Sequence, residues 1–194
     1  PQSQRQRVET ETASSGKAPK AMAVALGLAL AAGIGAWKFW PGATSDADLT
    51  EVARQEIQAE FDQALPLKMP VATNADEIDS GIQSLNLVPD EEQKLRDDIQ
   101  QGVVELVWFE VWDHMDPDGD VITFSAGSYQ ATVPVELAPQ VFVLPVATAS
   151  PQITVHATKD GAGFGGVTAA VRTSNGKVIL PVVPQGASFS VPLL

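Results

Sequence analysis

The chain has 194 residues, with 24 Asp and Glu against 12 Lys and Arg, a net charge of −12 and no cysteine. The absence of cysteine excludes a disulfide scaffold, a thiolate metal site, a cysteine nucleophile and a bacterial lipoprotein anchor. So acidic a chain is poorly suited to nucleic acid, because phosphate binding needs clustered Lys and Arg.

The distribution of charged residues divides the chain into three segments of different composition. Residues 1–40 hold five basic side chains against two acids, residues 46–120 hold twenty acids against four bases, and residues 121–194 are nearly balanced. Residues 1–20 contain one residue that could anchor a core, Val8, and therefore predict a disordered cytoplasmic tail.

Residues 21–40 predict a transmembrane helix. Its first seventeen residues carry no charge, which corresponds to about 25 Å of helix, at the short end of a bilayer span. Trp37, Phe39 and Trp40 would lie at the membrane interface, with Lys38 reaching the headgroups. The basic flank precedes this segment and the acidic region follows it, which predicts a bacterial inner-membrane protein with a cytoplasmic N-terminus and a periplasmic C-terminal domain. A signal peptide cleaved after Gly35-Ala36 is the alternative.

Small residues recur at a spacing of four within this predicted helix, which allows close approach of helix backbones. One interpretation is a packing face for other integral membrane subunits or for self-association through this helix, and the other is an Ala-rich anchor without a partner. The residues concerned are Ala25, Ala29 and Gly33 on one ridge, and Gly27, Ala31 and Gly35 on the other.

Residues 41–102 predict an acidic, periplasmic helical region. Apolar residues at helical spacing indicate helices over 46–65, about 75–86 and about 90–101. The expected boundary residues are Ser45 or Asp46 and Pro66 for the first helix, and Asp90 and Gly102 for the third. The acidic faces are either solvated or a docking surface for a basic partner.

Residues 103–194 predict an all-β antiparallel sandwich of immunoglobulin-like size. Ser174-Asn175-Gly176 is typical of a two-residue hairpin turn. Prolines at 134, 145, 181 and 192 predict edge or bulged strands. The expected strands are Val103–Trp112, Val121–Ala126, Tyr129–Val135, Gln140–Val146, Ile153–Thr158, Val167–Thr173, Lys177–Val183 and Ser188–Leu193.

The most specific chemical motif is an Asp-rich loop between the first two expected strands. Closely spaced carboxylates beside a glycine turn are typical of calcium sites. An EF-hand is a poor match, because aligning Gly119 at its sixth position puts His114 first and Ser125 last. A plain Asp-Gly turn is the competing interpretation. The candidate calcium ligands are Asp113, Asp116, Asp118 and Asp120, with Asp160 from another loop.

The remaining motifs favour structural roles. Residues 161–166 match G-x-G-x-x-G, but the residues that follow predict a strand and hairpin instead of the helix that a dinucleotide site requires. His156 alternates with threonines on the polar face of a strand, and Trp108 and Trp112 alternate as packing residues. His114 shares no zinc motif with His156. We find no catalytic constellation and expect a protein that is not an enzyme.

Residues 106–194 resemble uncharacterised bacterial extracytoplasmic β-sandwich proteins. The resemblance rests on the runs WDHMDPDGDVITF, GSYQATVPVELAPQVFVLP and KDGAGFGGVTAAVRTSNGKVILPVVPQGASFSVPL. In such proteins an Asp-Gly-Asp loop and a later Asp-Gly-Gly loop separate the strands. The resemblance implies a fold and a location outside the cytoplasm, and no activity.

The sequence therefore predicts a single-pass membrane anchor followed by short acidic helices and a β-sandwich. Its expected function is that of a non-catalytic accessory subunit of an inner-membrane complex, respiratory, photosynthetic or secretory. The alternative is a membrane-tethered calcium- or ligand-binding module, and an enzyme is the third hypothesis.

Overall fold

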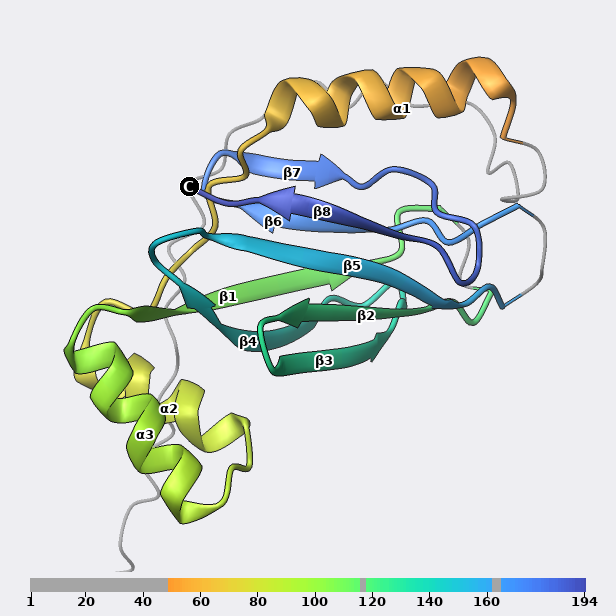
Figure 1. Cartoon of the computed structure of the whole chain (residues 1–194). Coiled ribbons are helices and arrows are strands. Elements are labelled where there is room, and N and C mark those ends of the chain that lie inside the picture. Colours follow the sequence, from red (N-terminus) through yellow and green to blue (C-terminus); the bar gives the residue numbers. More distant parts are fainter. Residues whose placement is uncertain (1–48, 116–117, 162–164) are drawn as a thin grey trace, which may run out of the picture. The chain divides into compact units, whose positions relative to one another are not determined.

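The computed structural model describes residues 49–115, 118–161 and 165–194, which belong to one compact unit. Three short helices precede eight strands, and the strands form two four-stranded antiparallel sheets packed as a β-sandwich (Figure 1). The predicted sandwich architecture is confirmed.

The three helices follow the predicted order, with two corrections at their starts. Helix α1 spans Glu51–Ala64, and its N-cap is Thr50, whose side chain accepts a hydrogen bond from the Ala53 amide. Leu49 and Thr50 are therefore not helical, and residues 45–48 lie outside the described residues. Helix α2 spans Ala75–Ser84 and α3 spans Pro89–Gln100.

The prediction that Asp90 caps α3 is wrong. Val88 is the N-cap residue, without a side-chain cap, and Pro89 occupies the first turn. Proline suits that position because it has no amide to satisfy and its φ angle is already helical. Gly102, with φ +70°, lies just beyond the end of the helix, as predicted.

One sheet has the strand order β4-β1-β6-β7 and the other has the order β3-β2-β5-β8. Burial alternates along β2 and along most of β5, whereas four consecutive residues of β4 are buried. The strands are β1 (Val104–Trp112), β2 (Val121–Ala126), β3 (Tyr129–Pro134), β4 (Gln140–Ala147), β5 (Gln152–Lys159), β6 (Ala170–Thr173), β7 (Gly176–Ile179) and β8 (Ser188–Pro192).

The sixth and seventh strands are shorter than predicted. Val167 and Val183 form only an isolated bridge with each other, so β6 starts at Ala170 and β7 ends at Ile179, before Pro181. The hairpin turn at Ser174-Asn175 is confirmed, because Thr173 pairs with Gly176. Pro134, Pro145 and Pro192 lie on the sheet-edge strands β3, β4 and β8, also as predicted.

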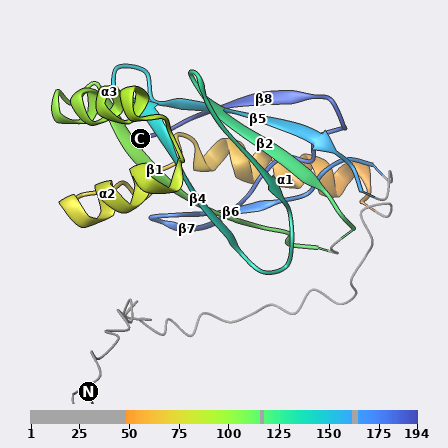
Figure 2. The ribbon, with the colours of Figure 1, turned by 90° about the horizontal axis from the view of Figure 1, so that it is seen from below.

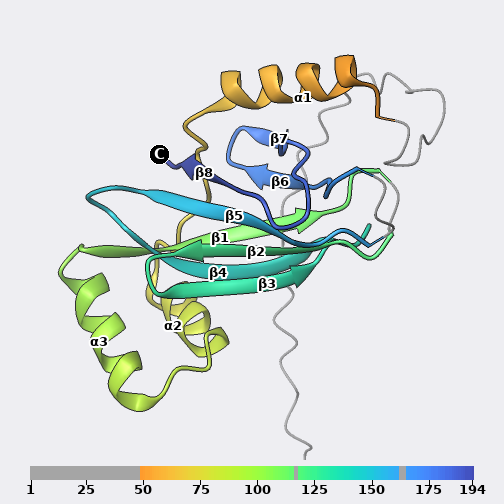
Figure 3. The ribbon, with the colours of Figure 1, turned by 45° about the vertical axis from the view of Figure 1, so that its right-hand side comes forward.

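Two apolar clusters stabilise the fold. The larger one fills the space between the sheets and includes Phe109, Phe124 and Leu144, together with Phe61 from α1. The smaller one comprises Ile82 of α2, Leu95 of α3, and Leu106 and Val143 on the outer face of β1 and β4. Figures 1 and 3 show α1 along the β7–β8 side of the sandwich, and Figure 2 shows α2 and α3 together at one end.

The segment between α1 and α2 connects the two sheets. Leu67 bridges Leu193 beside β8 in parallel orientation, and Val71 bridges Val107 of β1 in antiparallel orientation. The Trp108 amide also donates to the Pro70 carbonyl, with an N···O distance of 2.9 Å. We call residues 66–73 the connecting strap.

The predicted cytoplasmic tail and transmembrane helix lie outside the described residues. This includes the small-residue ridges and the interfacial residues at 37–40. None of the helices within residues 49–115, 118–161 and 165–194 has the length and apolar character that a membrane crossing requires.

Candidate metal centre

The antiparallel pairing of β2 with β5 brings two distant acidic residues together. Val121 at the start of β2 pairs with Lys159 at the end of β5. Asp120 immediately precedes β2 and Asp160 immediately follows β5, so both lie at the same end of this strand pair. The sequence reasoning proposed both residues, and the sheet register supplies the reason for their proximity.

Asp118, Asp120 and Asp160 form a three-carboxylate group, in which each offers an oxygen within 4.8 Å of the other two. Carboxylate oxygens are preferred ligands of hard cations, and calcium accepts six to eight oxygen ligands in flexible geometry. The group could therefore hold a metal ion such as calcium.

Asp120 is the buried member of the group, with 0% of its surface exposed. Its carboxylate accepts hydrogen bonds from the Gly161 amide at 3.0 Å and the Thr168 amide at 3.1 Å. Burial raises the pKa of Asp120 to about 6; the two amides oppose this rise and the nearby Asp118 carboxylate adds to it. The raised pKa means that ionised Asp120 opposes folding as the pH rises through about 6, unless positive charge compensates.

Two glycines allow the loops around these carboxylates to approach closely. A Cβ atom at Gly161 would lie 2.1 Å from the Asp118 carbonyl oxygen, which no other residue could tolerate. Gly166 has φ +113°, and its amide donates to the Asp160 carboxylate at 2.9 Å. From α1, the Arg54 guanidinium donates to the Gly165 carbonyl oxygen at 2.7 Å.

The other predicted ligands have different positions. Asp113 is buried and accepts a hydrogen bond from the Met115 amide at 2.8 Å, the arrangement of an Asx turn. It is not a member of the carboxylate group found among the described residues. Asp116 lies outside those residues. Burial, with a smaller contribution from Lys177, lowers the pKa of His114 to about 4, so this ring is neutral near pH 7.

The remaining singled-out residues have structural partners. His156 Nδ1 lies 2.8 Å from the Ser188 hydroxyl on the neighbouring strand, and both face outward. Trp108 packs against the smaller apolar cluster, and Arg172 lies over the Trp112 ring at 5.5 Å from its centroid. After Gly166 the chain enters the Val167 bridge and then β6, so no helix begins where a dinucleotide site would need one.

Sequence reasoning missed the contributions of the main chain. The amides of Gly161, Gly166 and Thr168 orient the carboxylates, and side-chain identity carries no signal for such donors. The glycines of the 161–166 motif were noticed for a different chemistry. The observed role of Gly161 and Gly166 in close loop packing could have been inferred only from the pairing of β2 with β5.

No protein-family model, curated protein or solved structure matches this chain. The resemblance of residues 106–194 to extracytoplasmic β-sandwich proteins therefore stays a prediction.

Proposed function

We propose that the protein is a calcium-binding β-sandwich module, with the ion held by Asp118, Asp120 and Asp160. The observation that carries this proposal is the mutual proximity of three carboxylates, one of them fully buried. The bound ion would connect the start of β2 to the end of β5 and has no catalytic role.

Electrostatics favours this assignment over a plain Asp-Gly turn. Two amides hold the Asp120 carboxylate beside Asp118, and burial, with a smaller contribution from Asp118, raises the pKa of Asp120. A divalent cation at this position would offset the repulsion and the desolvation together. A turn needs only the hydrogen bonds to amides and does not need three converging carboxylates.

A calcium titration of the full-length protein in detergent tests the proposal. At a calcium concentration of about 100 times Kd, binding stabilises the fold by about 2.7 kcal/mol. For a domain of this size that corresponds to a rise in Tm of roughly 5–10 °C. The double variant Asp118→Asn, Asp160→Asn should abolish both the binding heat and the rise in Tm, and it should not lower the Tm measured in chelator, because it removes the repulsion between Asp118 and Asp120.

The exposed Asp76→Asn on α2 is the matched control and should retain the full calcium response. If wild-type protein shows no binding heat and the same Tm in calcium and in chelator, the Asp-rich loop is only a turn. An equal loss of stability with and without calcium in the double variant would lead to the same conclusion.

We also propose that this immunoglobulin-like module is tethered to a bacterial inner membrane through residues 21–40, with its β-domain in the periplasm. The charge-free segment and its basic flank support this topology. Calcium sites of extracellular modules bind with Kd values of about 10⁻⁴–10⁻³ M, a range suited to such a location.

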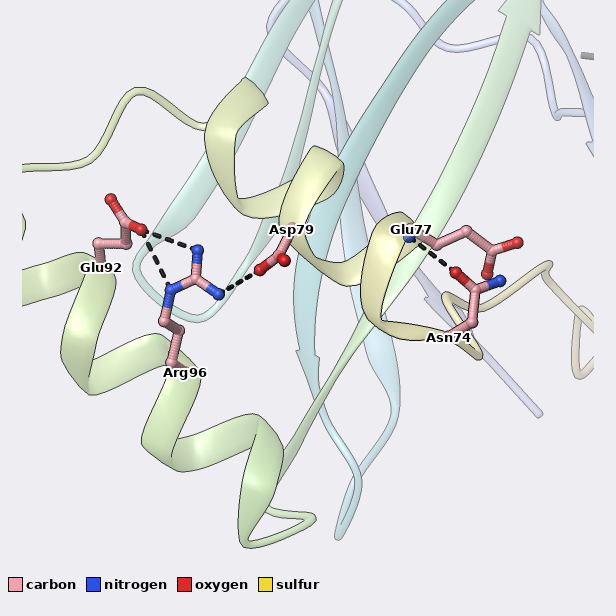
Figure 4. Close-up of polar contacts among 5 residues, drawn as sticks. All are labelled: Asn74, Glu77, Asp79, Glu92 and Arg96. Atoms are coloured by element: carbon pink, nitrogen blue, oxygen red, sulfur yellow. Dashed lines mark hydrogen bonds and ion pairs between the residues drawn. The ribbon is translucent and has the colours of Figure 1, made fainter. Parts of the chain in front are cut away.

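A second candidate function is the accessory subunit of an inner-membrane complex, and the surface of α2 and α3 supports it. Arg96 bonds to both Glu92 and Asp79 (Figure 4). Lys94 pairs with Asp98 at 2.6 Å, so both basic side chains are neutralised internally. The carboxylates that are left, such as Asp90 and Glu91, suit a basic partner.

Purification in mild detergent, with mass spectrometry of the co-purifying proteins, distinguishes the two candidates. A stoichiometric set of membrane proteins would support the accessory subunit. Isolation of the protein without partners, together with a calcium response, would support the tethered module.

A further inference from the structure

The three asparagines of the chain differ in what holds their side chains. The Asn74 carboxamide oxygen accepts a hydrogen bond from the Glu77 amide at 2.9 Å, as the N-cap of α2. The Asn86 carboxamide nitrogen donates to the Ser84 carbonyl oxygen at 3.2 Å. Asn175 is exposed in the β6–β7 turn, and its side chain has no hydrogen-bond partner among the residues that the structure describes. Its carboxamide is therefore free to rotate toward its own backbone.

The residue that follows Asn175 is a glycine in open space. Gly176 is exposed and has φ +123°, and a Cβ atom placed on it would meet no atom within 4 Å. The residues after the other two asparagines are Ala75 and Leu87, whose side chains hinder approach to their own backbone nitrogens. Of the three nitrogens, that of Gly176 is therefore the least hindered toward the preceding carboxamide.

The turn is held by hydrogen bonds whose geometry depends on its length. Thr173 pairs with Gly176 across the turn, and the Thr173 hydroxyl donates to the Gly176 carbonyl oxygen at 2.8 Å. The Asn175 amide donates to the same hydroxyl at 3.2 Å. The Ser174 amide donates to the Lys68 carbonyl oxygen of the connecting strap at 2.7 Å. A change in the backbone of this turn would therefore affect both β7 and the strap.

We propose that Asn175 is a site of spontaneous deamidation, and that the isoaspartate formed there loosens the β6–β7 turn. Solvent base removes the proton of the Gly176 amide, and the nitrogen attacks Asn175 Cγ. The new N–C bond forms, the carboxamide C–N bond breaks, and ammonia leaves, so that a succinimide ring remains. Water then opens the ring. Cleavage of the bond to Cγ gives aspartate, and cleavage of the bond to the main-chain carbonyl carbon gives isoaspartate. The net change consumes one water and releases one ammonia, without oxidation or reduction.

Isoaspartate changes the length of the turn. Its main chain runs through Cβ and Cγ of residue 175 and so contains one additional methylene. The length of a hairpin loop fixes the register of its strands, so the additional methylene displaces Thr173 relative to Gly176. Strand β7 is a four-residue edge strand that pairs with β6. The altered turn should therefore weaken this pairing and the bond from Ser174 to the strap. The proposal does not depend on the calcium site.

Peptide mass spectrometry of the full-length protein, aged in detergent at alkaline pH and below its Tm, tests the modification. The peptide that contains residue 175 should gain the mass difference between an amide and an acid, while the peptides with Asn74 and Asn86 keep their mass. Isomerisation of aspartates leaves the mass unchanged and cannot imitate this result. Unaged protein digested in parallel corrects for deamidation during digestion. The matched variant Asn175→Gln should keep its mass, because its longer side chain forms the larger ring much more slowly. An unchanged mass at residue 175, or an equal gain at all three asparagines, would overturn the proposal.

Amide hydrogen exchange of the aged protein tests the effect on the turn. Exchange should become faster at Ser174 and along β7 in the isoaspartate form, and it should remain as in unaged protein along β2. Unaged Asn175→Asp introduces the negative charge without the additional methylene and should exchange like the wild type. Unaltered exchange in the isoaspartate form would overturn the second part of the proposal. The same acceleration in unaged Asn175→Asp would also overturn it and would assign the effect to charge.

Discussion

Helix α1 and the α2–α3 hairpin are both acidic and amphipathic, yet they attach to the sandwich in different ways. Phe61 is the single buried residue of α1, and it enters the large core between the sheets. The hairpin buries Ile82 and Leu95 against the outer face of β1 and β4, in a small core of its own. The comparison teaches that the same helical pattern supports attachment centred on one buried side chain, which in α1 is assisted by the Arg54 hydrogen bond to Gly165, or attachment through a distributed cluster.

The hairpin also needs a close backbone approach that α1 does not. A Cβ atom at Gly81 would lie 2.9 Å from Leu106 Cδ1, so glycine lets α2 rest directly on β1. Arg96 of α3 then bonds to Asp79 of α2 and links the two helices of the hairpin (Figure 4). Attachment of the hairpin should therefore tolerate the loss of any one contact better than attachment of α1.

Phe61→Ala should have the largest effect of the substitutions that test this contrast. Removing a buried aromatic side chain costs about 3–5 kcal/mol, and here the edge-on contact with Phe189 is lost as well. We expect a lower urea midpoint and rapid amide hydrogen exchange throughout α1. The exposed Val52→Ala on the same helix is the control, and slow exchange of α1 in Phe61→Ala would show that other contacts hold the helix.

Leu95→Ala should have a smaller effect, toward the lower end of the range of about 2–5 kcal/mol for a buried leucine. Ile82, Leu106 and Val143 remain in contact in the variant, so the hairpin should stay on the sheet. Hydrogen exchange should rise in α3 and change little in α1. The exposed Gln100→Ala serves as the control, and complete release of both hairpin helices would remove the contrast with α1.

Lowering the pH should destabilise the start of α2 in the hairpin and leave the N-cap of α1 unchanged. A hydrogen bond from the Thr73 amide lowers the pKa of Glu77 below its ordinary value of 4.5, with further help from Asn74. The stabilisation is therefore fully present above pH 4.5 and is lost as the pH falls through the lower folded-state pKa. The Thr50 hydroxyl that caps α1 does not titrate in this range.

Amide exchange at the start of α2, measured between pH 5 and pH 3, checks this smallest effect. Glu77→Gln should remove the pH dependence at α2 and leave exchange in α1 as it is in the wild type. The same pH dependence in both proteins would assign it to another carboxylate.

Local sequence patterns predicted most of the fold because local chemistry determines it. The turn signals on either side placed β2 at its observed bounds, and Ser174-Asn175-Gly176 located the β6–β7 turn. The start of α3 was missed, because Asp90 is a good cap residue in isolation but Pro89 already satisfies the first helical position. The lengths of β6 and β7 were overestimated. The apolar residues at 167 and 183 have the same sequence pattern whether they form an isolated bridge or belong to a strand.

The candidate metal centre could be predicted only in part. Asp118, Asp120 and Asp160 were identified from their loop contexts, but their proximity depends on the pairing of β2 with β5, which is not a local property. Asp113 looked equivalent in sequence, and its observed contact is the Met115 amide of its own turn. Which carboxylates converge is decided by tertiary register.

The connecting strap has a consequence for the order in which the protein folds. Leu67 follows α1 directly and pairs with Leu193, from the opposite end of the described sequence. Contacts between residues so far apart form late, because the entropy cost of closing the long loop comes before any stabilisation. During synthesis, the strap at Leu67 therefore has to wait for the strand that ends at Pro192. Until β8 has formed, α1 lacks its contact with Phe189. The apolar interior that β8 will cover, beside β7, stays exposed to solvent and accessible to chaperones.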